Sequence, residues 1–170
     1  DLQVKTSFMG LPLPGIVPTA DLDRMLHISY LRRAFDAVNE IDIIVTSAGG
    51  HWQEGHSSFC QMFRAASLET VAQLDGAGCI GDMMWRPLGR NGPLTLQTEW
   101  RTVTLMELAQ LPDFVERGKA VLLLLGPCGN CGGPKGEVLR SILSTRNLIS
   151  HLVVDSRSAK ELFRKAPARA

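Results

Sequence analysis

The chain has 170 residues, of which 45% are hydrophobic and 21% are charged. This length suits one domain, and this composition supplies enough apolar surface for a core, which excludes a wholly disordered chain. With 18 Lys and Arg against 17 Asp and Glu, the formal charge of +1 lacks the basic excess of a nucleic-acid-binding surface. The longest apolar run, at 120–125, is far shorter than the roughly 18 residues of a membrane span, so we expect no membrane partner.

The cysteine content and the N-terminus of the sequence indicate where in the cell the protein is found. Four cysteines, at 60, 79, 128 and 131, are few for a secreted disulfide scaffold, and the N-terminus lacks the pattern of a secretory signal. We therefore expect reduced thiols and a cytoplasmic protein. The sequence starts with Asp rather than Met, which indicates a fragment of a longer chain.

Predicted strands and helices alternate along the sequence. Strands or extended segments are expected at 2–9, 41–46, 79–85, 94–99, 101–105, 120–125 and 151–155, and helices at 21–40, 67–74, 106–117, 134–143 and 158–165. The run AVLLLL at 120–125 is apolar on both faces, as in a central parallel strand. This alternation predicts a three-layer α/β/α, Rossmann-like domain with a mostly parallel sheet, filling residues 1–170.

Ligands of such domains bind at the carboxyl ends of the strands, which directs attention to the loop after Leu125. It contains Gly132, Gly133 and Lys135. Glycines let backbone N–H groups approach an anion, and a helix N-terminus and a lysine both favour negative charge. The loop therefore predicts binding of a phosphate or another anion, although it is neither a Walker A loop nor GxGxxG. The alternative is a plain strand-to-helix turn with a solvated lysine.

Cys128 and Cys131 form a CxxC in the same loop. Zinc requires about four ligands, and further candidates are Cys60, Cys79, His51 and His56. A redox dithiol is another reading. Because no second CxxC exists, we expect two incidental thiols, no metal and no cofactor.

Two further segments carry polar residues suited to ligand contact. The loop after Thr46 contains Gly49 and Ser57, but no nucleophile-elbow motif surrounds the serine, so no catalytic residue is expected. Asp82 follows Gly81 at or near a strand, where a carboxylate can accept hydrogen bonds from sugar hydroxyls. The alternatives are a solvated loop for the first and a cap or surface ion pair for Asp82.

Five motifs in order resemble the effector-binding domain of the SorC family of bacterial sugar-responsive transcription regulators. They read IDIIVTSAG, LDGAGCIGDMMWRPLGRNG, RTVTLMELAQLP, GGPKGEVLRSIL and NLISHLVVDSRSAKELF. The resemblance implies a fold similar to glucosamine-phosphate deaminase and ribose-phosphate isomerase, and binding of a phosphorylated sugar rather than catalysis. It also implies that Asp82 and Lys135 occupy ligand-contacting positions.

The resemblance also implies partners and missing parts. In the family a helix-turn-helix domain precedes a longer effector domain, so the chain is expected to lack that DNA-binding domain and the N-terminal third of the effector domain. DNA would be bound only through the absent domain, and exposed apolar surface predicts a homo-oligomer. Two alternatives stay open: a sugar-phosphate isomerase- or deaminase-like enzyme with His51, Glu54 or His56 as base, and a metal- or redox-responsive module.

Overall fold

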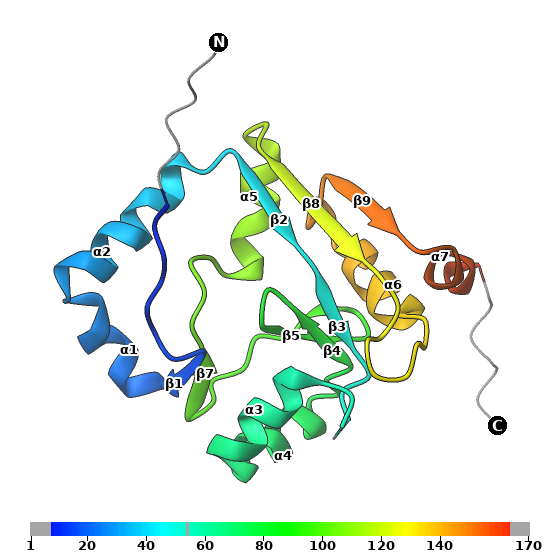
Figure 1. Ribbon diagram of the computed structural model, residues 1–170, viewed down its shortest axis with the longest axis horizontal. Coiled ribbons are helices and arrows are strands. Elements are labelled where there is room, and N and C mark those ends of the chain that lie inside the picture. The colour runs from blue at the N-terminus through cyan, green and yellow to red at the C-terminus, as the bar shows by residue number, and fades with distance from the viewer. Residues whose placement is uncertain (1–7, 54, 164–170) are drawn as a thin grey trace.

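The computed structural model describes residues 8–53 and 55–163 and confirms an α/β fold (Figure 1). Among these residues, the strands form a parallel sheet of three, an antiparallel sheet of four and an antiparallel pair. Parallel order is thus confined to one sheet, and the rest of the strand pairing is antiparallel.

The parallel sheet has the order β2-β8-β9, from β2 (Ile43–Thr46), β8 (Ala120–Leu125) and β9 (His151–Val154). Ile43 pairs with Ala120, and Leu122 pairs with His151. The prediction that these three apolar segments are neighbouring parallel strands is confirmed.

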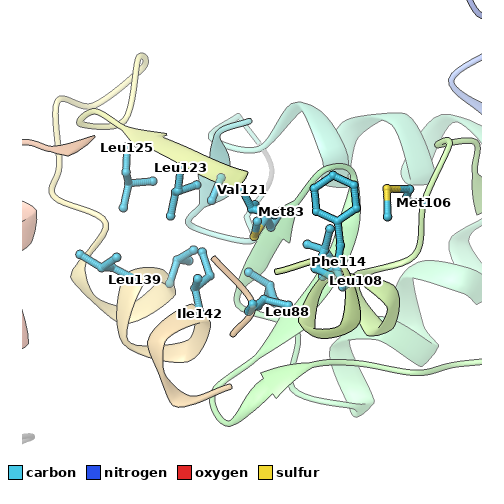
Figure 2. Packing of buried hydrophobic residues seen from close by; sticks show 14 residues of the cluster. Met83, Leu88, Met106, Leu108, Phe114, Val121, Leu123, Leu125, Leu139 and Ile142 are labelled. Carbon is cyan, nitrogen blue, oxygen red and sulfur yellow. The ribbon is translucent and has the colours of Figure 1, made fainter. Parts of the chain in front are cut away.

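Helices cover one face of this sheet. α5 (Leu111–Glu116) and α6 (Gly136–Ser144) pack there, and α7 (Ser156–Leu162) packs against α6. Figure 2 shows Val121, Leu123 and Leu125 of β8 facing Leu139 and Ile142 of α6. All five side chains are at most 3% exposed, which makes this layer the main hydrophobic core.

The opposite face of the parallel sheet is apolar and open. Ile43 and Val45 are 63% and 60% exposed, and Leu124 and Val153 are 42% and 58% exposed. The helices expected on this second face are not among the residues that the structure describes. We call these four side chains the open face.

The antiparallel sheet follows directly from β2. Its order is β3-β4-β5-β6, from β3 (Ala48–Gly50), β4 (Gly81–Met83), β5 (Arg86–Gly89) and β6 (Gly92–Pro93). Only Ser47 separates β2 from β3, so the chain passes at that residue from one sheet to the other. The expected strand at 79–85 is confirmed in part, but the sequence predicts loops where β3, β5 and β6 lie.

Two helices build a second, smaller core beside this sheet. α3 (Ser58–Ala66) and α4 (Leu68–Gly76) bury Phe59, Phe63 and Leu74 between them and the antiparallel sheet. Each helix has a serine cap, because Ser57 Oγ accepts from Cys60 N–H and Ser67 Oγ from Thr70 N–H. The sequence predicts α4 but not α3.

The N-terminal elements differ from expectation. In place of one helix over 21–40 the chain forms α1 (Thr19–Leu26), α2 (Ser29–Asp36) and the 3-10 helix η1 (Ala37–Glu40), because Ile28 adopts an extended conformation with ψ 120°. β1 (Ile16–Pro18) pairs with β7 (Trp100–Thr102). Of the strand expected at 2–9, residues 1–7 lie outside the described residues, and residues 8 and 9 are not in a strand.

The segment between β6 and β8 is less regular than expected. Of the two expected extended segments, 94–99 and 101–105, only residues 101 and 102 lie in a strand, because β7 covers residues 100–102. The helix expected at 106–117 begins as the 3-10 helix η2 (Leu108–Gln110) and continues as α5. Arg86 fastens this segment to β5, since its guanidinium donates to Thr104 Oγ1 at 3.0 Å and to Glu107 Oε1 at 2.6 Å.

Candidate functional site

A cavity of about 370 Å³ lies where the parallel sheet meets the antiparallel sheet. Its walls come from the carboxyl ends of β2 and β8, from β3 and β4, and from the first turn of α3. The lining residues with side chains suited to binding are Ser57, Asp82, Trp85, His56, Cys128, Asn130 and Lys135. This position matches the general rule that ligands of parallel α/β sheets bind beyond the strand ends.

Asp82 enters the cavity because the strand beside it has no side chain. β3 and β4 pair so that Gly49 lies opposite Asp82, and a Cβ at position 49 would collide with Asp82 Oδ1. Burial raises the pKa of Asp82 from 3.8 to about 6, while the Trp85 N–H and the charge of Lys135 oppose that rise. At pH 7 the side chain is therefore mainly a carboxylate with free acceptor capacity.

Lys135 reaches the same cavity from the start of α6. Its Nζ donates to the carbonyl of Ala48 at 2.9 Å, and its side chain lies against Gly50, where an added Cβ would be 3.2 Å from Cγ. The backbone N–H of Lys135 donates to Ser158 Oγ at 2.8 Å, which fixes the start of α6 against α7. The structure thus brings Asp82 and Lys135 together, one acceptor and one cation in a single cavity.

The anion-binding role expected for the N-terminus of α6 needs correction. Glu161 of α7 already lies there, and its Oε2 accepts from the Gly136 N–H at 2.9 Å. A carboxylate at this point satisfies the helix N-terminus and repels a second anion. The helix N-terminus that does face the cavity is that of α3, through Ser57, Ser58 and Phe59.

The other predicted contacts divide into two groups. Gly49 and Ser57 line the cavity, although the Ser57 hydroxyl also caps α3. Gly132 and Gly133 are not among the lining residues, because the loop after β8 presents Cys128, Gly129 and Asn130 instead. Gly132 has φ +63° and serves the turn that closes the loop.

Sequence reasoning missed Met84 and Trp85, which form the two-residue turn between β4 and β5. Both have positive φ, 53° and 58°, as in a type I′ hairpin turn, where Asn-Gly is the usual pair. Bulky residues in this conformation are strained, and nothing in the sequence signals the turn. Trp85 is 44% exposed and lies 6.3 Å from Phe59 between ring centroids, so an indole flanks the cavity.

The cysteines have contrasting surroundings. The pKa of the Cys128 thiol is lowered to about 7, chiefly by hydrogen bonds from the backbone N–H groups of Cys131 and Asn130. Burial raises the pKa of Cys79 to about 12. None of the four cysteines forms a disulfide, and the environment of Cys128 favours the thiolate.

Comparison with known proteins supports the fold. Neither a family model nor a curated protein matches the sequence. Among the solved structures that share its fold are several described as bacterial transcription regulators or as sugar-binding domains of such regulators. The resemblance to the SorC family drawn from the five motifs is thereby confirmed at the level of the fold.

Three of these structures illustrate the likeness. A DeoR family regulator from Listeria monocytogenes superposes with TM-score 0.68 at 18% identity, over 90% of this chain and 57% of that one. The full-length sorbitol operon regulator SorC from Klebsiella pneumoniae gives 0.65 at 16%, over 89% and 44%. A structure described as a SorC family regulator from Enterococcus faecalis gives 0.65 at 14%, over 91% and 55%. The chain therefore spans about half the length of the structures it matches.

Within the residues that the structure describes, no helix is both long and apolar enough to cross a membrane.

Proposed function

We propose that this chain is the effector-binding domain of a bacterial transcription regulator and that its effector is a phosphorylated sugar. The observation that carries the proposal is the placement of Asp82 and Lys135 in one cavity at the sheet edge. The fold shared with sugar-binding domains of regulators supports it. The enzyme alternative has less support, since the similar structures are regulators. Of its candidate bases, Glu54 lies outside the described residues.

In this proposal the charged and the neutral groups of the cavity bind different parts of the ligand. The Asp82 carboxylate accepts hydrogen bonds from sugar hydroxyls and so selects their arrangement. Lys135 and the N–H groups of Ser58 and Phe59 at the start of α3 attract the phosphate, because the first N–H groups of a helix have no acceptor within it. The next N–H group, that of Cys60, is already bonded to Ser57 Oγ. Trp85 offers an aromatic face to the apolar side of the sugar ring. No cofactor takes part, and Gly49 keeps room for the Asp82 carboxylate.

The test is calorimetry of the chain with a panel of sugar phosphates, free sugars and inorganic phosphate. Loss of one charge-assisted hydrogen bond weakens binding by roughly 1.5–3 kcal/mol, or about 10- to 150-fold. We expect Lys135→Ala to weaken binding of the phosphorylated sugar by this factor while leaving the weak binding of the free sugar nearly unchanged. Asp82→Asn is expected to weaken both ligands.

Matched controls are available on the surface. Lys160 on α7 and Asp113 on α5 are exposed and lie away from the cavity, so Lys160→Ala and Asp113→Asn should bind as the unaltered chain does. Unchanged affinity in Lys135→Ala or Asp82→Asn would remove that residue from the site. Failure of every sugar phosphate to bind would reject the function itself.

We further propose that the chain forms a homo-oligomer through the open face of the parallel sheet. Four exposed apolar side chains on adjacent strands, Ile43, Val45, Leu124 and Val153, are the surface a second copy would cover. Effector binding would then shift the population of assemblies that present the DNA-binding domains. The same proposal covers the longer protein. It would contain those DNA-binding domains and the remaining third of the effector domain, and it would be cytoplasmic.

Association is tested by light scattering and sedimentation of the chain at about 100 μM, a concentration at which contacts of 1 μM affinity saturate. We expect a mass above that of one chain, and we expect Val45→Lys to reduce it to the monomer. The exposed Glu40→Lys is the control, since it adds charge outside the open face. A monomeric mass for the unaltered chain would reject this oligomer.

A further inference from the structure

Two loops that are distant in the sequence bring a histidine and two cysteines together. His56 lies just before α3, and Cys128 and Cys131 lie in the loop after β8. One ligand atom from each of the three side chains lies within 4.8 Å of the others. Cys128 is buried, His56 is partly buried and Cys131 is exposed, so the cluster is open to solvent on one side.

The cluster is held by the backbone before any ligand binds. The Cys128 N–H donates to the Gly133 carbonyl at 2.8 Å, and the Gly132 N–H donates to the Cys128 carbonyl at 2.8 Å. These two bonds close the CxxC turn on itself. Asn130 Nδ2 donates to the Gly55 carbonyl at 2.6 Å, which ties this turn to the loop that carries His56.

One atom of the cluster lacks a partner in the protein. His56 Nδ1 is buried and makes no hydrogen bond of regular geometry with any described residue, and the group that the His56 side chain meets is the Cys128 thiol, whose pKa it helps to lower. Leaving a buried polar atom without a partner is costly. A cation among the two sulfurs and the imidazole would supply that partner.

A second histidine lies beside the cluster. A Cβ added at Gly133 would be 3.1 Å from Cys131 Sγ and 3.2 Å from His51 Nε2. The His51 and His56 rings are 6.2 Å apart between centroids. His51 Nε2 and Cys131 Sγ therefore both border the space that glycine leaves at position 133, although His51 lies outside the group of atoms within 4.8 Å of one another.

We propose that His56, Cys128 and Cys131 bind a zinc ion, with His51 as the fourth ligand. Two cysteines and two histidines are a usual donor set for structural zinc. Tetrahedral ligand atoms at about 2.0–2.3 Å from zinc lie roughly 3.3–3.8 Å apart, so the three clustered side chains need small rotations and the exposed His51 needs a larger one to close the site. Two thiols lose their protons to solvent, and the two thiolates neutralise the charge of the ion.

This assignment departs from the sequence-based expectation of incidental thiols, and it does not depend on sugar binding. Its consequence for the fold is local: the ion would crosslink the loop after β8 to the loop before α3. His56 and Cys128 also line the proposed effector cavity, so the crosslink would hold two of its walls at a set distance.

The experiment uses the reduced chain, freed of metal by dialysis against a chelator and then titrated with Zn²⁺ in competition with a chromogenic chelator. We expect one equivalent of zinc per chain. Titration with Co²⁺ should give a thiolate charge-transfer band and the intense visible bands of a tetrahedral ion. A chain without saturable binding, or Co²⁺ spectra of an octahedral aquo type, would overturn the site.

Variants identify the ligands. Cys131→Ser and His56→Ala should each weaken zinc binding by more than the roughly 10- to 100-fold typical of losing an outer-sphere partner. The Cys131 side chain is exposed, so its replacement should not impair folding. His51→Ala should weaken it as well, and unchanged affinity there would remove His51 as the fourth ligand. The controls are Cys60→Ala and His27→Ala, a cysteine and a histidine outside the cluster, whose affinity should not change.

The alternative that Cys128 and Cys131 act as a redox dithiol predicts a different result, a disulfide between them. Alkylation and mass spectrometry report a Cys128–Cys131 disulfide directly. Recovery of that disulfide in protein purified with reductant, in place of zinc, would assign the pair to dithiol chemistry and overturn the proposal. Equal zinc affinity in the unaltered chain and in Cys131→Ser would overturn it too.

Discussion

The parallel sheet and the antiparallel sheet differ in what their side chains do. β8 supplies Val121 and Leu123, both 0% exposed, to the main core. β3 and β4 supply Ala48 and Met83 to the same core, but their other positions are glycines and Asp82, which leave space and charge beside the cavity. Both sheets therefore contribute to the main core, but the glycines and the carboxylate that shape the cavity lie on the antiparallel sheet, so substitutions at core and cavity positions should separate stability from binding.

Leu123→Ala has the largest expected effect on stability. The side chain is fully buried among α6, α5 and the neighbouring strands, and a Leu→Ala change at such a site costs about 2–5 kcal/mol of unfolding free energy. Urea denaturation measures this loss. A cost below 1 kcal/mol would contradict the assignment of the main core to the covered face.

Asp82→Asn is expected to raise stability while it weakens effector binding. The folded-state pKa of about 6 exceeds the ordinary value of 3.8, so the folded state binds this proton more tightly than the unfolded chain does. Protonated Asp82 therefore contributes to the free energy of unfolding below about pH 4, and this contribution is lost as pH rises through 6. A shift of two pKa units corresponds to at most roughly 3 kcal/mol.

The variant does not titrate at this position, so its advantage over the unaltered chain should be absent near pH 4, grow between about pH 4 and 6 and be complete above pH 6. Thermal unfolding at pH 4 and pH 8 measures the difference, with Asp113→Asn as the exposed control. An advantage of equal size at both pH values would show that burial of a charge is not its cause.

Leu124→Ala has the smallest expected effect. This side chain neighbours Leu123 in sequence but is 42% exposed on the open face, so the monomer should lose less than about 1 kcal/mol. Denaturation at low chain concentration measures the monomer alone. A cost matching that of Leu123→Ala would show that the open face is covered in solution even at that concentration.

The parts of the fold that could be predicted from the sequence are those in which composition alone identifies the element. The runs at β2, β8 and β9 are apolar along their length, so a buried strand is the natural reading. β3 reads AGG and β5 reads RPLG, and neither has an apolar pattern. Both are strands because the tertiary fold pairs them with β4.

The candidate site also contains residues that the sequence could indicate and residues that it could not. Asp82 and Lys135 could be proposed because each stands beside glycines and matches a family motif. The turn at Met84 and Trp85 could not, since both residues disfavour positive φ. The contact of His56 with the CxxC pair depends on the relative position of two loops, which no local pattern encodes.

The glycine positions on β3 and β4 also indicate how relatives that share this cavity could be recognised from their sequences. A side chain at Gly49 would displace the Asp82 carboxylate, one at Gly81 would strike the Gly49 carbonyl, and one at Gly50 would press on Lys135. The similar solved structures keep the fold at only 14–18% identity, so most positions tolerate exchange. A search weighted on these three glycines together with Asp82 and Lys135 is therefore expected to separate relatives that retain the cavity from those that retain only the fold.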